Sequence, residues 1–319
     1  MTERITRISR PVGGEPHFRM PIKMVPPDVS IIIVTYNTAA VVGMCLDSLG
    51  PGADPSREVF VVDNASTDGG ADIVRNRYPW IHLTVNTENR GFAAANNQFL
   101  PLCRGRYIYY LNPDAKLTGP GVIEKCVRFM DANPGVGLAG TRLINPDGSF
   151  QESVSRRYPG EKFATSEMAG LKGSIACILG ASMVARTDLI RQIGGFDDDF
   201  ILYGEDQDLC LRVRRAGYEI GYIDDAVVVH YGGQSERQSV PAEVWKKKTR
   251  AEYLFYRKHY LPETIARIRR ADLCKARFRL TTLALTMPFL GDRVRTERKR
   301  TKYRAIYETL KPLNSEGSN

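Results

Sequence analysis

One carboxylate in this sequence stands directly after an apolar run. The run at 107–111 stops at the tripeptide NPD, so Asp114 follows what reads as a buried strand. Pro113 fixes its own backbone φ and thereby restricts the loop that presents the carboxylate. Carboxylate oxygens are preferred ligands of Mg²⁺ and Mn²⁺, and a cation held there would neutralise two phosphates. The sequence therefore predicts a metal ligand at Asp114, beside a phosphorylated ligand.

Two other apolar runs also end in polar side chains. The run at 29–35 ends in Thr35 and is followed by Asn37, and the run at 58–63 ends in Asp63. Any one such residue is more often a turn or helix cap than part of a site. In an open α/β sheet, however, ligands bind outside the carboxyl ends of the strands. Three polar strand ends together therefore favour a binding site.

The glycine-rich motifs that usually bind phosphates are missing. The sequence contains no GxxxxGK[ST], and no GxGxxG follows the first apolar run. A P-loop or a dinucleotide-binding fingerprint is therefore excluded. A nucleotide bound here would need another source of positive charge, which a divalent cation provides.

The stretch GEDQDLCLRVRRAG at 204–217 has the charge pattern of an α-helix, with acids in its first turn and arginines near its end. Helix structure explains most of it, including a possible pair between Asp208 and Arg212 at i,i+4 spacing. Asp206 is explained less well, because Cys210 lies one turn later on the same, inward face. An acid in that position suits a general base. The pattern favours Asp206 as the catalytic base.

A histidine closes another apolar run. The sequence AVVV at 226–229 ends in His230. A lone histidine is more often structural than a ligand, but this one again stands at the end of a strand-like segment. His230 is therefore a candidate second metal ligand, beside Asp114.

The elements that must position these residues alternate along the first 140 residues. Strand-like runs at 29–35, 58–63, 81–85, 106–111 and 136–140 alternate with helical stretches at 39–49, 69–77, 92–101 and 120–132. This alternation predicts an α/β fold with a mostly parallel sheet and helices on both faces. Further on, NPDG at 145–148 predicts a hairpin, and another apolar segment follows at 177–184.

Length and composition are those of a globular protein. The chain has 319 residues, of which 43% are hydrophobic, enough for a sizeable core. Its six cysteines form no CxxC pair, which is typical of reduced thiols in a cytosolic compartment. Residues 1–27 read as a loose leader without the apolar segment of a secretory signal. No 18-residue apolar run occurs, so no membrane-spanning helix is expected.

The net charge of +9 is concentrated near the C-terminus. Residues 241–319 contain 20 Lys and Arg against 8 Asp and Glu, whereas residues 1–240 contain 25 against 28. A nucleic-acid-binding protein with uniform basicity would not show this division, so no nucleic-acid partner is expected.

The basic segment is expected to be helical. Its apolar stretch at 280–290 is too short to span a bilayer, but its basic flanks suit a helix that lies on an anionic membrane surface. The alternative is a helical hairpin that packs on the rest of the protein and exposes a basic face to water.

Six motifs resemble, in order and spacing, the family 2 glycosyltransferases of GT-A fold, and within them the bacterial rhamnosyltransferase-like branch. They are VSIIIVTYN, VVDNASTDG, NRGFAAANN, YYLNPDA, GGFDDDFILYGEDQDLCLRVRRAG and VVVHYGGQS, and they span about 29–235. The resemblance implies a GT-A (nucleotide-diphospho-sugar transferase) catalytic domain at 28–240. A loose leader at 1–27 would precede it, and a basic amphipathic helical extension at 241–319 would follow it.

The resemblance also implies roles for individual residues. Contacts to the nucleotide-sugar are implied for Thr35, Asn37, Asp63, Asn89, Gly91 and Asn112. The tripeptide NPD matches the family's DxD motif, in which the last aspartate binds Mg²⁺ or Mn²⁺. Asn112 replaces the first aspartate, so the metal would rest mainly on Asp114, with His230 as the later ligand. Asp206 matches the catalytic base, with Glu205 as the alternative, and 194–197 would line the acceptor side.

The implied reaction is a metal-dependent, inverting sugar transfer in bacterial cell-surface polysaccharide synthesis. It would move L-rhamnose from dTDP-L-rhamnose to a hydroxyl of a glycan or of a polyprenyl-diphosphate-linked acceptor, at the cytoplasmic face of the inner membrane. UDP-galactofuranose, UDP-glucose and UDP-N-acetylglucosamine are alternative donors, because no motif here fixes the contacts to the sugar.

Two other functions are weaker alternatives. A sugar-phosphate nucleotidyltransferase would normally carry a glycine-rich loop with a basic residue after the first strand, and TYNTA at 35–39 is not one. A non-catalytic nucleotide-sugar-binding module would be free to lose Asp63, Asp114, Asp206 and His230, yet all four are present.

Overall fold

The structure is a computed structural model that describes residues 26–50, 54, 56–232, 240–286 and 293–311. The leader expected at 1–27 lies outside these ranges except for residues 26 and 27. Residues 233–235 of the last motif and 287–290 of the apolar stretch near the C-terminus also lie outside them.

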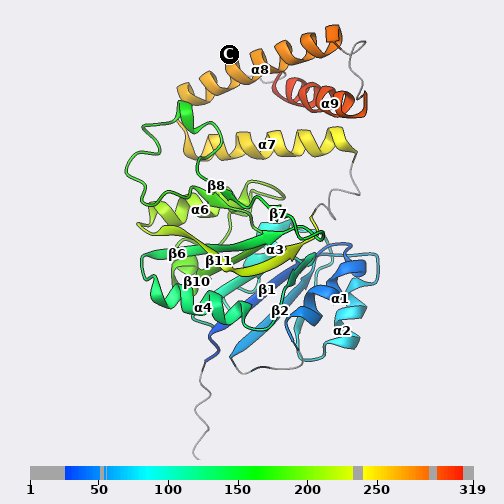
Figure 1. Cartoon of the computed structure of the whole chain (residues 1–319), viewed down its shortest axis with the longest axis vertical. Helices are drawn as coiled ribbons and strands as arrows, with labels where there is room; N and C mark the ends of the chain where they lie inside the picture. The colour runs from blue at the N-terminus through cyan, green and yellow to red at the C-terminus, as the bar shows by residue number, and fades with distance from the viewer. Residues whose placement is uncertain (1–25, 51–53, 55, 233–239, 287–292, 312–319) are drawn as a thin grey trace, which may run out of the picture.

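The elements of the first half of the chain are β1 (Val29–Thr35), α1 (Ala39–Ser48), β2 (Arg57–Asp63), α2 (Gly70–Arg77), β3 (His82–Val85), α3 (Phe92–Asn97), β4 (Tyr107–Leu111), β5 (Ala115–Leu117), α4 (Val122–Ala132) and β6 (Val136–Ile144). The second half contains β7 (Phe150–Gln151), β8 (Val154–Ser155), η1 (Glu161–Phe163), β9 (Cys177–Ile178), β10 (Ser182–Arg186), α5 (Thr187–Gln192), α6 (Glu205–Arg215), β11 (Glu219–His230), α7 (Pro241–His259), α8 (Pro262–Thr286) and α9 (Arg293–Leu310). Figure 1 shows their arrangement.

Nine strands form one sheet in the order β3-β2-β1-β4-β10-β6-β11-β5, with β7 paired to β6. The neighbours β3, β2, β1 and β4 are all parallel, as are β6 and β11. Strand β10 runs antiparallel between β4 and β6, and β5 runs antiparallel beside β11. The predicted mostly parallel sheet is confirmed.

Helices cover both faces of this sheet, and the burial of β1 shows why its sequence is continuously apolar. Ile31 and Ile33 face one side, where they pack in a core with residues of α1, α2 and α4. Ile32 and Val34 face the other side, where the core includes residues of α3, α5, α6 and α7. A strand covered on both faces needs apolar side chains at every position.

Strand register fixes where the polar strand ends meet. Strands β1 and β2 pair in parallel from Val29 with Arg57 to Thr35 with Asp63, so their last residues lie side by side. Strand β4 pairs with the other edge of β1 and delivers the NPD tripeptide near the same end of the sheet. Three motifs that are far apart in the sequence are thereby gathered at one edge.

The predicted hairpin at 145–148 is present between β6 and β7. The Gly148 amide donates to the Asn145 carbonyl over 2.9 Å, and Gly148 has a φ of +82° that favours glycine. The hairpin matters for the site because it places Gln151, the last residue of β7, beside the end of β11.

Several predicted boundaries were wrong. The strand expected at 136–140 continues to Ile144. The helix expected at 92–101 ends at Asn97, whose side chain turns away to donate 2.8 Å to the Phe196 carbonyl. The strand expected at 226–230 already begins at Glu219. Its register to β6 shifts between Ile223 and Val227, so an irregularity interrupts the apolar pattern and hides the strand's first half.

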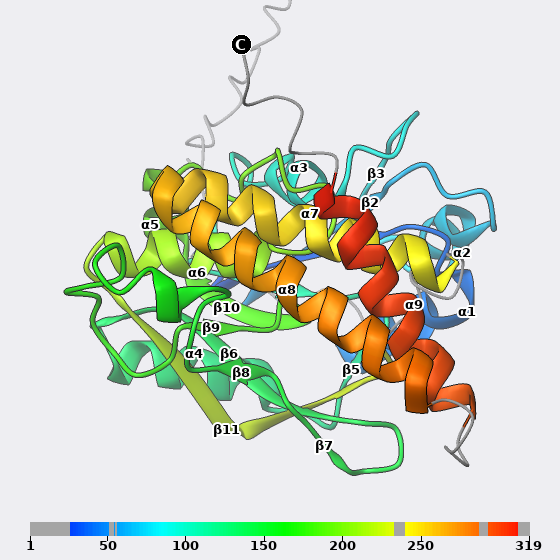
Figure 2. The same ribbon diagram turned by 90° about the horizontal axis from the view of Figure 1, so that it is seen from above.

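In the described part of the chain's last quarter, 240–286 and 293–311, helices α7, α8 and α9 form a layer beside the sheet domain (Figures 1 and 2). Helix α7 packs on the core through residues that include Tyr253, Phe255 and Tyr256. Helices α8 and α9 pack on each other, and α9 also packs on α7. None of the helices in the described part of the chain is long and apolar enough to cross a membrane.

Candidate functional site

The ends of β1 and β2 are joined by side-chain hydrogen bonds. The Thr35 hydroxyl donates to Oδ2 of Asp63 over 3.1 Å and to the Val62 carbonyl over 3.3 Å. The other Asp63 oxygen accepts the Ser66 amide at 2.9 Å, and the whole Asp63 residue is buried. Asp63 therefore holds the loop that follows β2, and its predicted contact to a nucleobase stays a prediction.

Asn37 joins the loops after β1 and β2. Its φ of +50° lies in the left-handed region, which asparagine tolerates better than most residues. Its side-chain oxygen accepts the Thr67 amide at 2.9 Å, and its own amide donates to the Ser66 hydroxyl at 2.9 Å. Asp68 then accepts the Ala39 amide at 2.7 Å, at the start of α1. The two loops form one fixed wall.

Asn64 connects this wall to the predicted donor loop at 89–91. Its amide donates to Oδ1 of Asn89 at 2.9 Å and to the Gly91 carbonyl at 3.1 Å. Its carbonyl oxygen accepts the Arg90 amide at 3.0 Å and the Asn86 side chain at 3.0 Å. Sequence reasoning noted Asn64 only as a polar strand end. Its buried amide, with four partners, is the link that brings Asn89 and Gly91 to Asp63.

Gly91 is required at its position. It has a φ of +82°, and a Cβ there would stand 3.0 Å from the Cα and carbonyl oxygen of Ile201. The next amide, that of Phe92, donates to the same Ile201 carbonyl over 2.9 Å. The predicted donor loop therefore rests against the segment that leads into α6.

Asp114 and His230 meet where β5 and β11 pair. His230 is opposite Ala115 in the antiparallel register, and the two side chains approach to 3.5 Å between Nε2 and Oδ1. Both residues are buried. Asn112 shapes the turn through its backbone, donating to the Ala181 carbonyl at 2.9 Å and accepting the Ala115 amide at 3.0 Å. The predicted pair of metal ligands is thus brought together.

Gln151 orients His230 and was missed by sequence reasoning. Its Oε1 lies 2.8 Å from His230 Nδ1, and its Nε2 donates to Asn145 at 3.1 Å. Because Oε1 can only accept, Nδ1 carries the ring proton and Nε2 presents its lone pair towards Asp114. A metal-binding histidine is commonly held in this way. Only the hairpin at 145–148 hinted at this residue.

The residues at this point fit a divalent cation that shares its ligands with a diphosphate. A carboxylate oxygen and a free imidazole nitrogen face each other, and Mg²⁺ sites often use one or two protein side chains together with substrate phosphates. A cage made by the protein alone is not present: no group of three or more His, Cys, Asp or Glu suited to a metal occurs among the residues that the structure describes.

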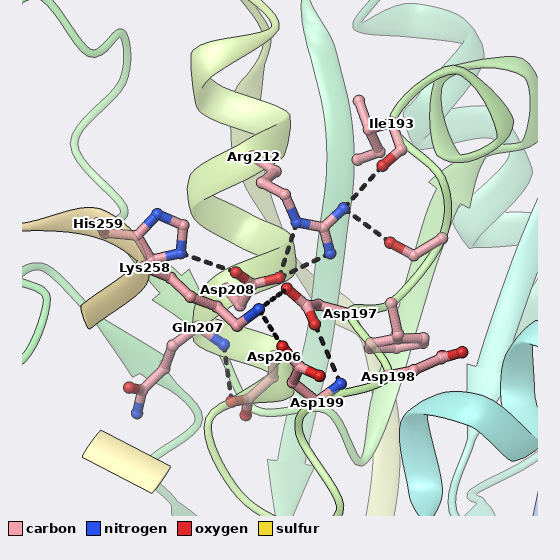
Figure 3. Close-up of polar contacts among 12 residues, drawn as sticks. Ile193, Asp197, Asp198, Asp199, Asp206, Gln207, Asp208, Arg212, Lys258 and His259 are labelled. Carbon is pink, nitrogen blue, oxygen red and sulfur yellow. Dashed lines mark hydrogen bonds and ion pairs between the residues drawn. The ribbon is translucent and has the colours of Figure 1, made fainter. Parts of the chain in front are cut away.

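Asp206 lies in the first turn of α6, with its carboxylate held by two backbone amides. Gly180 donates to Oδ2 at 3.2 Å, and Gln207 donates to Oδ1 at 2.8 Å, the contact that Figure 3 shows. Burial raises the pKa of Asp206, and these hydrogen bonds partly offset it. The next carbonyl after Gly180, that of Ala181, accepts the Asn112 amide. One stretch of backbone therefore links Asp206 to the NPD turn.

Glu205 is placed differently from Asp206. Its Oε2 atom is buried without a hydrogen-bond partner. Burial, followed by the negative charge of Asp206, raises the pKa of Glu205 to about 8. Of the two neighbours, Glu205 therefore keeps its proton to the higher pH, and Asp206 is the first to become a carboxylate. This favours Asp206 over Glu205 as a base.

The predicted residues fall into three linked groups. The first comprises Thr35, Asn37, Asp63, Asn89 and Gly91; the second comprises Asn112, Asp114 and His230; the third comprises Glu205 and Asp206. The backbone at 180–181 joins the second group to the third, and Ile201 joins the first group to the segment before the third. The arrangement can bind a phosphorylated ligand through a cation and hold a base nearby.

Comparison with known proteins shows the family to which the chain is similar. Residues 30–194 match the model of the family described as glycosyl transferase family 2. The chain is 24% identical over 255 residues to an N-acetylglucosaminyl-diphospho-decaprenol L-rhamnosyltransferase of Mycobacterium tuberculosis, covering 70% of this chain and 82% of that protein. It is 26% identical over 211 residues to glycosyltransferase AglE of Haloferax volcanii, covering 64% and 67%.

Solved structures share the fold. A mannosyltransferase of Pyrobaculum calidifontis in complex with GDP-Man and Mn²⁺ superposes with a TM-score of 0.57 at 20% identity, covering 93% of this chain and 92% of that one. S. aureus TarS in complex with UDP gives a TM-score of 0.50 at 17% identity, covering 91% and 92%. The GT-A fold predicted from the sequence is confirmed.

The link from Gln151 to His230 leads to a prediction about metal affinity. Gln151→Leu frees the ring to turn and to protonate at Nε2, so we expect Mn²⁺ to bind about 10–100-fold more weakly. The measurement is calorimetric titration of Mn²⁺ in the presence of UDP and, separately, dTDP. Gln192→Leu, an exposed change at the end of α5, is the matched control. Equal affinity in Gln151→Leu and the wild type would show that Gln151 has no such role.

The raised pKa of Glu205 leads to a prediction about stability. Between pH 4.5 and about 8 the folded protein keeps a proton on Glu205 that the unfolded chain releases. The free energy of unfolding therefore falls as pH rises through this window. Glu205→Gln removes that loss of stability. The melting temperature of the variant minus that of the wild type should therefore increase by several degrees between pH 5 and pH 9.

Thermal melts at pH 5, 7 and 9 make this measurement. Glu263→Gln is the control, because Glu263 is an exposed acid in the first turn of another helix, α8. Asp206 also has a raised pKa, but neither variant replaces this residue. A constant difference between Glu205→Gln and wild type across the three pH values would contradict the prediction.

Proposed function

The chain belongs to glycosyl transferase family 2, and we propose that it transfers a sugar from a nucleotide-sugar donor to an acceptor hydroxyl with inversion at the anomeric carbon. The observation that carries this proposal is the link through 180–181. It joins Asp206, a half-buried carboxylate, to the NPD turn beside Asp114 and His230. A base and a diphosphate-binding pair in one rigid unit are what a single displacement needs.

Asp206 is the base in this proposal. Its carboxylate accepts the proton of the acceptor hydroxyl while that oxygen forms a bond to the anomeric carbon. The bond from the same carbon to the nucleoside diphosphate breaks, so one sugar–oxygen bond replaces another. A weak base suffices because the hydroxyl loses its proton only as the new bond forms. The amides of Gly180 and Gln207 keep the carboxylate aimed and ionised.

Asp114 and His230 would hold Mg²⁺ or Mn²⁺ between them and the donor diphosphate. When bound, the ion supplies positive charge where the leaving diphosphate gains negative charge. Asp114 offers a carboxylate oxygen, and Gln151 keeps His230 in the tautomer that offers Nε2. The complex of the P. calidifontis mannosyltransferase with GDP-Man and Mn²⁺ supports this proposal for a protein of the same fold.

We propose dTDP-L-rhamnose as the donor and a polyprenyl-diphosphate-linked glycan as the acceptor. Support comes from the M. tuberculosis relative, whose name specifies an L-rhamnosyl transfer to N-acetylglucosaminyl-diphospho-decaprenol. At 24% identity the donor sugar can differ, so UDP-galactofuranose, UDP-glucose and UDP-N-acetylglucosamine are the alternatives to test. Such reactions build bacterial cell-surface polysaccharides.

A lipid-linked acceptor calls for a membrane-facing surface, and α8 offers one. We propose a catalytic domain at 28–240 and a helical extension at 241–319 that rests on the cytoplasmic face of an anionic membrane. Helix α8 exposes Phe278 and Leu285, which are 64% and 69% accessible. The exposed arginines 270, 277 and 279 share this helix. Exposed aromatic and aliphatic side chains among arginines suit an anionic lipid surface.

The donor is tested by calorimetry with dTDP-L-rhamnose, UDP-glucose, UDP-N-acetylglucosamine and UDP-galactofuranose, each with and without Mn²⁺. We expect one of them to bind, and to bind more tightly with Mn²⁺. Asp206→Asn should bind that donor as tightly as the wild type but release nucleoside diphosphate at least about 100-fold more slowly, because the base is lost.

Glu205→Gln is the matched comparison, because it replaces the adjacent acid, which already holds a proton, with a neutral amide of similar shape. We expect it to slow turnover by less than about tenfold. Faster turnover in Asp206→Asn than in Glu205→Gln would transfer the role of base to Glu205. Failure of all four donors to bind would contradict the proposed function as stated.

Vesicle flotation tests the membrane surface. Wild-type protein should bind vesicles that contain phosphatidylglycerol and not vesicles of phosphatidylcholine alone. Changing Arg270 and Arg277 to Gln should weaken binding about tenfold or more, because each arginine near an anionic surface contributes about 1 kcal/mol. Arg75→Gln, at an exposed position on α2, is the control. Unchanged binding in the double variant would place the membrane contact elsewhere.

A further inference from the structure

The last turn of α7 carries a lysine that holds two acids of a distant loop (Figure 3). Lys258 Nζ lies 2.8 Å from Oδ2 of Asp197 and 2.6 Å from Oδ2 of Asp199. These hydrogen bonds raise the pKa of Lys258. Asp197 in turn accepts the Asp199 amide at 3.1 Å, and its carbonyl accepts the Phe200 amide at 3.1 Å. The lysine therefore fixes the turn that begins the segment 197–208.

The next residue of α7 holds the other end of that segment. His259 Nε2 lies 2.7 Å from Oδ1 of Asp208, which is fully buried in α6. His259 Nδ1 lies 2.8 Å from Arg215, and an arginine can only donate, so Nε2 carries the proton that goes to Asp208. Burial raises the pKa of Asp208, but the His259 hydrogen bond and the Arg212 charge bring it below its usual value.

Arg212 closes a ring of contacts around this segment. Its Nε donates to Oδ2 of Asp208 at 2.7 Å, as the i,i+4 spacing predicted. Its NH1 donates to the carbonyls of Ile193 and Gly195 at 3.0 and 2.8 Å. The start of the loop, the helix α6 and the end of α7 are thereby held at one place (Figure 3).

The same segment is also held from the predicted donor side. Asn97 of α3 donates to the Phe196 carbonyl at 2.8 Å and to Asp198 at 2.7 Å, and it accepts the Phe196 amide at 2.9 Å. Each of the three successive acids thus has a defined partner. Asn97 of α3 bonds Asp198, and Lys258 of α7 pairs with the acids on either side of it. The segment 197–208 is therefore fixed both to α3 and to α7 of the C-terminal extension.

Asp206 lies within the segment 197–208, two residues before Asp208. The residues just before α6 have left-handed φ values, +71° at Tyr203 and +86° at Gly204. A non-glycine residue persists in that region only where its surroundings enforce it. Lys248 of α7 lies over the Tyr203 ring at 4.8 Å, so α7 contacts this turn as well.

We propose that Lys258 and His259, the α7 terminus, are positioning residues that set the place of the base Asp206 by fixing both ends of 197–208. The proposal rests on the proposed function, because it assigns the α7 terminus a part in that reaction. It makes the C-terminal extension a working component of the catalytic site, in addition to any role at a membrane. Without Lys258, the adjacent acids 197–199 repel one another and the turn opens.

The first test is amide hydrogen exchange on the full chain, which needs no donor. Lys258→Met removes the charge and keeps most of the side-chain volume. The amides of Asp199 and Phe200 should exchange at least about tenfold faster, because both bond to Asp197. Lys258→Arg should restore protection. Lys246→Met is the matched control: Lys246 is on the same helix, is equally exposed at 25%, and pairs with Glu243 and Glu308 instead.

The second test separates positioning from mere stability. With the donor that the calorimetric panel selects, Lys258→Met should lower kcat about tenfold while the KM for the donor stays within about twofold of wild type. His259→Gln keeps a donor near the Nε2 position and should retain activity, whereas His259→Leu should lose it to a similar degree as Lys258→Met. Lys246→Met should match the wild type in both parameters.

Wild-type exchange at Asp199 and Phe200 in Lys258→Met would overturn the proposal. So would a wild-type kcat in Lys258→Met, or an equal loss in Lys246→Met. Failure of every donor to bind the wild type would contradict the proposed function, while the exchange measurement would still report whether Lys258 fixes the turn. The two failures are therefore distinguishable.

Discussion

Three carboxylates begin helix α6, and the rest of the site depends on how each buried charge is compensated. Arg212 and His259 compensate Asp208, so that its pKa falls despite burial. Backbone amides compensate Asp206 only in part, and its pKa rises. The buried Oε2 atom of Glu205 has no hydrogen-bond partner, and the pKa of Glu205 rises to about 8. One turn of helix thus holds a structural anion, a carboxylate free to accept a proton, and a neutral acid.

This division assigns different tasks to different parts of the chain. Arg212, one turn later in α6, supplies positive charge to Asp208, and His259 of α7 donates a second hydrogen bond to it from 51 residues later in the sequence. Helix α7 can do so only because Tyr253, Phe255 and Tyr256 pack it into the same core as α6. The hydrogen bond from α7 to Asp208 therefore depends on the apolar packing of the extension against the core. The extension that we propose to rest on a membrane therefore contacts, through α7, the helix that carries the proposed base.

Local pattern was sufficient for the elements and for the polar strand ends. Continuous apolar runs marked the parallel strands, and the acids and arginines of 204–217 marked α6 with its Asp208–Arg212 pair. Local pattern could not show β10 running antiparallel in the middle of the sheet, because periodicity carries no direction. It also missed Gln151, Lys258 and His259, since each acts on a residue 50 to 80 positions away. Roles that arise from long-range contacts leave no trace in spacing.

The presence of Asn112 in place of an acid has a physical consequence at the proposed cation site. Asn112 contributes its backbone to the turn, and this use does not depend on its side chain. The site therefore presents one carboxylate, Asp114, with the His230 imidazole beside it. A single negative charge attracts a divalent cation weakly in water, whereas the two or more charges of a bound diphosphate complete the attraction. Cation and nucleotide should thus bind as a unit, and the low charge of the empty site avoids the cost of burying a second unpaired carboxylate.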